Sequence, residues 1–321
     1  MRYKKPTGPS PTLAITNSIL EKLRAGTRPW VRPWREGQGG LPIRENGQRY
    51  RGINSLWLWM VADENGFASN RWMTYRQAQS VGGQVRKGER SSIAVFYKQI
   101  GTADEEADSD AAADGEGASG IRRVLKSYHV FNCDQIENLP ERYAPEPVAR
   151  MEVSDHKAAI DAFIRASGAQ VRHGGDRAFY NPKADTIQLP LPEQFLSYQG
   201  YGAVAAHELS HWTGHQSRLD RDLTGRFKSD AYAMEEMIAE LAAATIGGEL
   251  QLPVEHLENH ASYIATWIKV LENDERALFT AAAKAEAAAD YLLAKAGLGL
   301  RNEAEAEGPD IDANEPERLA A

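Results

Sequence analysis

The chain has 321 residues, of which 42% are hydrophobic and 26% are charged, and its formal net charge is −8. This length and composition allow one large domain or two domains of ordinary size. The single cysteine, Cys133, excludes an intrachain disulfide and a four-cysteine zinc site, and it is typical of a protein of the reducing cytoplasm. The sequence has no run of about 18 apolar residues, so we expect neither a membrane span nor a membrane partner.

The charge is divided unevenly along the chain. Residues 1–99 contain 17 Lys and Arg against 6 Asp and Glu, a balance of +11, whereas residues 143–321 contain 16 bases and 29 acids, a balance of −13. Between them, residues 101–120 carry seven acids and no base. A basic half favours a polyanion as its partner, although uneven surface charge without a partner would give the same composition.

The first half of the chain mixes helical and strand patterns. Apolar residues at helical spacing predict helices in TLAITNSILEKLRAG, in YRGINSLWLWMVADENG and in TYRQAQSVG. The β-branched and aromatic runs SSIAVFYKQI and RRVLKSYHVFNC predict two strands. The acidic stretch 101–120 lies between these strands, so we expect it to be a disordered insert at the tip of a hairpin.

Three prolines within LPERYAPEPVARMEV mark a domain boundary. After it, the patterns predict a helix in SDHKAAIDAFIRASG, short strands in QVRHGG, RAFYNP and DTIQLP, and helices near 198–214, 229–247 and 255–296, the last one broken or bent. We therefore predict an α+β protein with domains at 10–142 and 150–298. The acidic, apolar-poor tail at 299–321 is expected to be disordered.

The stretch VAAHELSHWTGHQSRL contains the pattern H-E-x-x-H at His207, Glu208 and His211. Residues four apart lie on one face of a helix, so both imidazoles can bind one Zn²⁺. Glu208 is rotated by about 100° from His207, which places it beside the metal as a general base rather than on it. The pattern also occurs by chance on solvated helices, and there it holds no metal.

A third histidine, His215, does not fit the same site. It lies about 12 Å beyond His207 along a continued helix, whereas two ligands of one zinc ion approach each other within about 4 Å. The metzincin pattern turns the chain at a glycine, which Gly214 matches, but its third histidine position is Ser217 in this chain. We therefore interpret His215 as a residue of the helix end or of the surface.

The helical stretch SDAYAMEEMIAELAAATIGG offers the third ligand. Glu236 and Glu240 are four apart on one face of this alanine-rich helix. Glu236 as the ligand gives a His₂Glu site with one open position and leaves Glu240 to accept a hydrogen bond from a ligating imidazole. Glu240 is the main alternative ligand, Glu235 is the less favoured one, and a solvated acidic pair is the interpretation without a metal.

A His₂Glu zinc site with an adjacent carboxylate predicts metal-assisted hydrolysis of a peptide bond. Glu208 would act as general base and would then return the proton to the leaving amine. The strand DTIQLP, just before the metal-binding helix, would offer an edge on which an extended peptide lies. Tyr232 and His215 are the candidates for stabilising the oxyanion.

The first domain alternates arginine and tryptophan, most clearly in RPWVRPWR at residues 28–35. Arginines neutralise phosphates and aromatic rings stack on unpaired bases, and no helix-turn-helix or zinc finger is visible, so we predict single-stranded DNA as the partner. The alternatives are a solvated basic face and tryptophans in a core. The candidate DNA-binding residues are Arg28, Trp30, Arg32, Trp34, Arg51, Trp72, Arg86, Lys87 and Arg90.

Taken together, these stretches resemble the ArdC-type antirestriction proteins of conjugative plasmids. ITNSILEKLRAGTRPWVRPW, YRGINSLWLW and YHVFNCDQIENLP are similar to that family's N-terminal domain, which also occurs on TraC-type primases. AFYNPKADTIQLP, HELSHWTGHQSRLDRD and YAMEEMIAELAAATIG are similar to its zincin-like metallopeptidase domain. The acidic insert at 101–120 departs from the compact family pattern.

The resemblance implies an α+β nucleic-acid-binding domain joined to a mostly helical zincin-like domain with a small sheet. It also implies protection of incoming plasmid DNA from host restriction. Three functions remain open: a DNA-binding antirestriction protein with a zinc metallopeptidase that cuts a host protein, a DNA-binding shield with a non-hydrolytic structural zinc site, and a free-standing protease whose basic half recognises an acidic protein. We expect the first.

Overall fold

The computed structural model describes residues 9–27, 40–101, 113–114, 121–145, 153–225, 229–250, 252 and 260–298. These residues form two compact units. The described residues of unit 1 fall within Met1–Pro42, Arg49–Asn70 and Pro145–Arg301, and those of unit 2 within Ile43–Gln48 and Arg71–Ala144. Helices combined with small sheets confirm the predicted α+β class.

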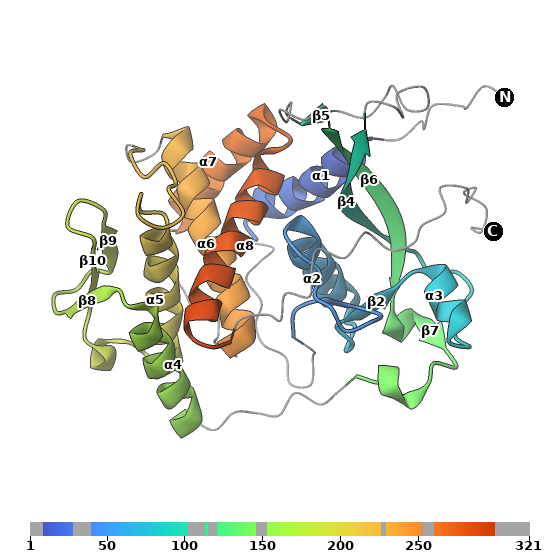
Figure 1. Ribbon diagram of the computed structural model, residues 1–321, viewed down its shortest axis with the longest axis horizontal. Helices are drawn as coiled ribbons and strands as arrows, with labels where there is room; N and C mark the ends of the chain where they lie inside the picture. The colour runs from blue at the N-terminus through green and yellow to red at the C-terminus, as the bar shows by residue number, and fades with distance from the viewer. Residues whose placement is uncertain are drawn as a thin grey trace. The chain divides into compact units, whose positions relative to one another are not determined.

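Unit 1 is mostly helical. Figure 1 shows α5, α6 and α8 side by side, with a small sheet against α5. The predicted helix near 255–296 is described from residue 260 as two helices that meet at Asp274–Arg276. The helices of unit 1 are α1 (Pro11–Arg24), α2 (Ile53–Asn65), α4 (Val153–Ser167), α5 (Tyr198–Thr213), α6 (Asp230–Leu250), α7 (His260–Asn273) and α8 (Ala277–Lys295).

The small sheet of unit 1 has the strand order β8 (Gln170–His173), β10 (Thr186–Leu189) and β9 (Phe179–Asn181). The middle strand, β10, runs parallel to β8 and antiparallel to β9, so that Ile187 pairs with Val171 on one side and with Tyr180 on the other. Its side chains alternate between buried and half-buried positions. One face of the sheet therefore packs on the helical core.

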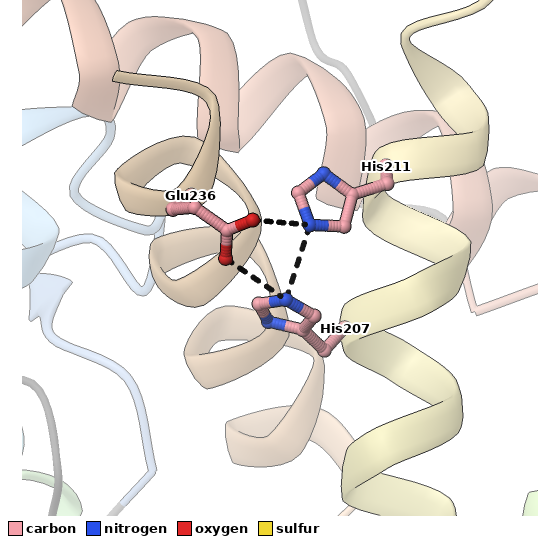
Figure 2. Close-up of side chains that lie close together, drawn as sticks. All are labelled: His207, His211 and Glu236. Carbon is pink, nitrogen blue, oxygen red and sulfur yellow. Dashed lines mark hydrogen bonds and ion pairs between the residues drawn. The ribbon is translucent and has the colours of Figure 1, made fainter. Parts of the chain in front are cut away.

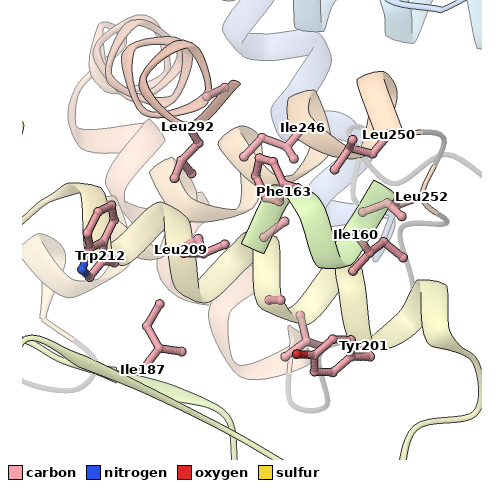
Figure 3. Packing of buried hydrophobic residues seen from close by; sticks show 14 of the residues in the cluster. Ile160, Phe163, Ile187, Tyr201, Leu209, Trp212, Ile246, Leu250, Leu252 and Leu292 are labelled. Carbon is pink, nitrogen blue, oxygen red and sulfur yellow. The ribbon is translucent and has the colours of Figure 1, made fainter. Parts of the chain in front are cut away.

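Apolar side chains from α4, α5, α6 and α8 meet in one core (Figure 3). Ile160, Phe163, Leu209, Ile246 and Leu292 are almost fully buried there. Each such side chain stabilises the fold by about 1.5–3 kcal/mol relative to an exposed one. This core holds α5 against α6, and these two helices carry the candidate metal site.

The start of α5 follows from its sequence. Ser197 caps the helix, because its hydroxyl accepts a hydrogen bond from the backbone N–H of Gly200 at 3.0 Å. A Cβ at Gly202 would lie 2.9 Å from Ile160. The glycine therefore lets α4 approach α5 closely, and the helix predicted near 198–214 is confirmed as Tyr198–Thr213.

Unit 2 is built on a long antiparallel hairpin. Strands β4 and β6 pair from Ser92 with Val130 to Gly101 with Ile121, which confirms the two predicted strands. The short helix α3 begins at a capping box made by Thr74 and Gln77. The elements of unit 2 are β1 (Ile43–Arg44), β2 (Arg71–Met73), α3 (Tyr75–Ser80), β3 (Gln84–Val85), β4 (Ser92–Gly101), β5 (Ala113–Asp114), β6 (Ile121–Asn132) and β7 (Ile136–Glu137).

The main sheet of unit 2 has the order β1-β2-β6-β4, with β5 also paired to β6, while β3 and β7 form a separate pair. The β5 strand, Ala113–Asp114, belongs to the stretch that was expected to be wholly disordered. Residues 102–112 and 115–120 of that insert, and the tail at 299–321, lie outside the described residues. Within the described part of the chain, no helix is long and apolar enough to cross a membrane.

The two units divide the chain differently from the predicted domains. Helices α1 and α2 belong to unit 1, where α1 contacts α7 and α2 contacts α8. The hydroxyl of Thr16 donates to the carbonyl of Glu275 at 3.0 Å, and Arg24 pairs with Glu272 at 2.7 Å. The apolar faces of these helices are buried by partners more than 200 residues away, which no local pattern indicates.

Candidate metal centre

His207 and His211 lie one turn apart on α5 and point into the same space (Figure 2). Their Nε2 atoms are 3.1 Å apart. Two ligands at about 2.1 Å from one tetrahedral zinc ion lie about 3.4 Å from each other. The observed separation is therefore close to that of two nitrogens that share one ion.

Glu236 faces both imidazoles from α6. Its carboxylate oxygens lie 3.6 Å from Nε2 of His207 and 3.7 Å from Nε2 of His211. One donor atom from each of the three residues can be chosen so that all lie within 4.8 Å of one another. The structure thus brings together the three predicted ligands, and two nitrogens with one carboxylate oxygen are a donor set that suits a divalent cation such as Zn²⁺.

The charges of this cluster are coupled. Burial opposes the charged form of His207, but the ion pair with Glu236 and the charges of Glu208 and Glu240 outweigh burial and raise the pKa of His207. Burial likewise acts against ionisation of Glu236, yet the two imidazoles hold the pKa of its carboxyl well below its usual range. The cluster therefore favours positive charge at its centre, and a bound cation would replace a proton there.

Glu208 lies beside the ligands rather than among them. Its carboxyl is buried, and burial raises its pKa above the ordinary value while the two imidazoles oppose that rise. The backbone N–H of Tyr180, in β9, donates a hydrogen bond to this carboxylate. A carboxylate whose pKa is raised and that lines a cleft is a candidate for general acid–base catalysis.

A cleft of about 1040 Å³ runs over the cluster. Its walls come from α5, α6, α7, β9 and the turn before α5, and they include the exposed apolar side chains Phe179 and Leu196. The cleft is large enough for several residues of an extended peptide. Glu208 and the three predicted ligands belong to the polar part of its lining.

The prediction that the strand DTIQLP offers the edge on which an extended peptide lies is wrong. That strand is β10, which pairs with β8 on one side and with β9 on the other, so its backbone groups are already used. The strand that lines the cleft is β9, through Phe179 and Tyr180. Periodicity identifies a strand but not its place in the sheet, and this explains the error.

One predicted histidine ligand is contacted by a carboxylate at Nδ1, the ring nitrogen that faces away from the cluster. This carboxylate belongs to Glu235, not to Glu240. Nδ1 of His211 lies 3.1 Å from the carboxylate of Glu235, whereas Nδ1 of His207 is buried and has no hydrogen-bond partner within the described part of the chain. Glu240 acts on His207 through its charge. The sequence indicated Glu235 only as a less favoured ligand, and it gave no indication of Arg221, with which Glu235 pairs.

The two candidates for stabilising an oxyanion are separated in the structure. Tyr232 lines the cleft and shares a hydrogen bond with Glu236. His215 is not among the described residues that line the cleft, and its Nδ1 lies 2.8 Å from the hydroxyl of Ser217. The hydroxyl of Tyr263, on α7, lies 3.0 Å from that of Tyr232 and also lines the cleft. Tyr263 carried no signal in the sequence, because its place depends on how α7 packs on α6.

The described members of the predicted DNA-binding set have different environments. Trp72 is 0% exposed, so its ring cannot stack on a base, and its assignment is corrected to the core. Arg51 is committed to Glu286 and Asp290, at 2.9 and 2.5 Å, which neutralises its charge. Arg28, Trp30, Arg32 and Trp34 lie outside the described residues.

Three members of the basic set are exposed in unit 2. Arg86, Lys87 and Arg90 lie in the segment between β3 and β4. Arg86 pairs with Glu89 at 2.7 Å, and Glu89 is held in turn by the side chain of Gln135 at 3.0 Å. On the adjoining hairpin, the ring of Tyr97 is 50% exposed. Unit 2 therefore exposes cations in this segment and an aromatic ring on β4 to solvent.

Comparisons with known proteins agree with this arrangement. Residues 12–131 match the N-terminal domain of the antirestriction factor ArdC, and residues 158–284 match a zincin-like metallopeptidase domain. The metal-free crystal structure of the antirestriction protein ArdC from plasmid R388 is similar over 90% of this chain and 99% of its own, with 38% identity and a TM-score of 0.74. The chain belongs to the ArdC antirestriction family.

Other ArdC relatives extend the comparison. The R388 protein is also known in a Mn(II)-bound structure, which is 39% identical, covers 89% of this chain and 97% of its own, and has a TM-score of 0.72. The protein y4eC of Sinorhizobium fredii, whose function is uncharacterised, is 39% identical over 90% of this chain and 93% of its own length. The DNA primase TraC of Escherichia coli is 40% identical over 87% of this chain, which corresponds to 27% of the primase.

Proposed function

We propose that this ArdC family member binds single-stranded DNA, holds Zn²⁺ in a peptidase site, and protects incoming plasmid DNA from host restriction in the cytoplasm. His207, His211 and Glu236 would hold the ion. The observation that carries the proposal is the convergence of these side chains, within 4.8 Å, beside a buried carboxylate in a large cleft. A His₂Glu donor set with an open cleft is the pattern of catalytic rather than closed structural zinc sites.

The proposed chemistry is hydrolysis of a peptide bond. A divalent cation, when bound, supplies a Lewis acid that polarises a carbonyl and makes water more acidic. Glu208 accepts the proton of the attacking water and later delivers it to the leaving amine, while the N–H of Tyr180 keeps its carboxylate in place. The phenol of Tyr263 lies in the cleft, where it can donate a hydrogen bond to the developing oxyanion.

DNA binding is proposed for the N-terminal half. It is supported by the balance of +11 over residues 1–99, by the exposed cations Arg86, Lys87 and Arg90, and by the ArdC N-terminal domain match. Cations of this kind contact phosphates without regard to sequence, and an exposed ring such as Tyr97 can stack on a base. Trp72 and Arg51 are no longer among the proposed contacts.

The main alternative is a DNA-binding shield whose metal site does not hydrolyse anything. Glu208→Gln separates the two, because it removes the base and leaves all three proposed ligands. If peptidase chemistry is the mechanism, this variant retains metal but loses protection of a plasmid transferred into a restricting host. Protection equal to that of the unaltered protein would favour the shield. Glu193→Gln, an exposed acid in the turn before α5, is the matched control.

A free-standing protease whose basic half recognises an acidic protein is the third function. Retention on immobilised oligo-dT, followed through a salt titration, separates it from the other two. A DNA-binding protein is retained at low salt and released as salt rises, because phosphate contacts release counterions. Absence of retention at low salt would leave the protease as the better interpretation.

A further inference from the structure

The two proposed histidine ligands differ at their outer nitrogen. Nε2 of His211 faces the cluster, and its Nδ1 lies 3.1 Å from an oxygen of Glu235. Nδ1 of His207 is buried, and no residue that the structure describes forms a hydrogen bond with it. A carboxylate only accepts hydrogen bonds, so the contact with Glu235 requires the proton of His211 on Nδ1 and leaves the lone pair of Nε2 for the cluster.

Glu235 is itself held in place by a second buried residue. Arg221 donates from Nε to one carboxylate oxygen at 2.9 Å and from Nη2 to the other at 2.8 Å. The two side chains are only 4% and 9% exposed. A bidentate pair in a buried setting has one orientation, so the oxygen that faces His211 cannot rotate away.

Arg221 is anchored to the end of α5, the helix that carries His211. Its Nη1 donates to the hydroxyl of Thr213 at 2.8 Å, and its Nη2 donates to the carbonyl of Ser210 at 2.7 Å. The guanidinium thus connects the last turn of α5 with Glu235 on α6. The two helices that supply the proposed ligands are joined at the outer side of the cluster by charged hydrogen bonds as well as by apolar contacts.

Gly214 makes the space for this arrangement. Its φ of −74° is ordinary for any residue, so its backbone does not require glycine. A Cβ at this position would lie 2.9 Å from Nη2 of Arg221 and 2.9 Å from the side chain of Leu223. The glycine that matched one position of a metzincin pattern therefore has a steric role here, because it admits the guanidinium.

We propose that Glu235 and Arg221 are positioning residues for His211: together they fix the tautomer and the ring orientation that present Nε2 to a divalent cation. The proposal rests on the metal site of the proposed function. The helical spacing had assigned to Glu240 the role of orienting a ligating imidazole. The proposal gives this role to Glu235, together with Arg221 from the loop after α5. Among the described residues, no carboxylate forms an equivalent hydrogen bond with Nδ1 of His207.

The test is the affinity of the full chain for Zn²⁺ at fixed pH, measured by competition with a chromophoric chelator. Glu235→Ala is expected to lower the affinity about 10- to 100-fold, as loss of such an orienting partner does elsewhere. Glu235→Gln retains an amide oxygen that can accept the proton of Nδ1, so its affinity should be restored to between those of the alanine variant and the unaltered chain. A purely structural role of Glu235 would not give this order of zinc affinities.

A matched control is available in a neighbouring ion pair. Arg218, three residues before Arg221, makes a bidentate contact with Asp185 at 2.5 and 3.0 Å and is also largely buried. Asp185→Asn disturbs an arginine–carboxylate pair that contacts none of the proposed ligands. Asparagine also tolerates the φ of 49° at this position. Its zinc affinity should equal that of the unaltered chain.

Circular dichroism and thermal unfolding of the metal-free variants show whether each one is folded. If both Glu235 variants fail to fold, Gly214→Ala takes their place: it keeps both charges, displaces the guanidinium and should lower the affinity severalfold. A folded Glu235→Ala or Gly214→Ala with an affinity within about twofold of the unaltered chain would overturn the proposal, as would an equal loss in Asp185→Asn. If the unaltered chain binds no zinc, it is the proposed metal site that fails.

Discussion

The metal cluster and the basic, aromatic set of the N-terminal half differ in how their members are arranged. The three predicted ligands come from two helices, and their donor atoms converge within 4.8 Å. The described members of the basic set have different environments. Trp72 lies in the core, Arg51 is held by two acids, and Arg86, Lys87 and Arg90 are exposed in a single segment of unit 2.

The difference follows from the range of the interactions that each set depends on. Two of the three ligands are related by helical spacing, which the chain fixes within one turn. A DNA-binding face depends on which side chains the tertiary structure leaves exposed and which cations it pairs with acids. Arginine and tryptophan serve both uses, so their frequency indicates a function but not the residues that perform it.

The largest expected effect tests the assignment of Trp72 to the core. Trp72→Ala should lower the free energy of unfolding by about 3–5 kcal/mol, because it removes a fully buried ring. Chemical denaturation of the purified variant measures this change. Tyr97→Ala, which alters a half-exposed ring, should change the same quantity by less than about 1 kcal/mol. A stable Trp72→Ala with weakened DNA binding would restore the stacking assignment.

The next largest effect distinguishes the proposed ligand Glu236 from Glu240, the alternative ligand on the same face of α6. Glu236→Ala should lower the affinity for Zn²⁺ by more than about 100-fold, a larger loss than that of a residue beyond the ligands. Glu240→Ala, one helical turn away, should cost at most about 100-fold, since it removes charge near His207 but no proposed donor atom. Equilibrium dialysis followed by metal analysis measures both affinities. The reverse order would exchange the roles of the two carboxylates.

A smaller effect concerns the acid that holds Arg51. Burial raises the pKa of Glu286 to about 7, although Arg51 and the N–H of Gly52 oppose this rise. Since the folded state holds this proton more tightly than the unfolded state does, the contribution of Glu286 to stability falls as pH rises from about 4.5 to 7, by up to about 3 kcal/mol.

Glu286→Gln should remove this dependence, because an amide does not titrate. The unfolding free energy of the metal-free variant should match that of the unaltered chain near pH 5 and should exceed it at pH 8. Urea titrations at the two pH values give the comparison. A variant that is less stable at pH 8 would show that the ion pair with Arg51 outweighs burial.

The smallest expected effect maps the DNA contacts. Lys87→Ala and Arg90→Ala should each weaken binding to oligo-dT severalfold, and each should reduce the slope of log affinity against log salt by about 0.7. Fluorescence anisotropy at several salt concentrations measures both quantities. Arg51→Ala should leave the slope unchanged, because its guanidinium is already paired with Asp290 at 2.5 Å. A reduced slope in Arg51→Ala would return that residue to the interface.

Most of the secondary structure could be predicted from residues near one another in the chain. The helix that carries the histidines, the long hairpin of β4 and β6 and the break between α7 and α8 each depend on local spacing or turn residues. The grouping of α1 and α2 with unit 1 could not be predicted in the same way, since it depends on contacts with α7 and α8. The place of DTIQLP as the middle strand also depends on its two partners.

The sequence by itself determined that two imidazoles would share one helical face with a carboxylate beside them, because the geometry of a single turn is the same wherever the helix lies. Only the tertiary structure decided that Glu235 and Arg221 would contact His211, that Tyr263 would line the cleft and that Trp72 would be buried. These outcomes depend on how distant elements pack, and packing is set by the combined volumes and charges of residues that no local window contains.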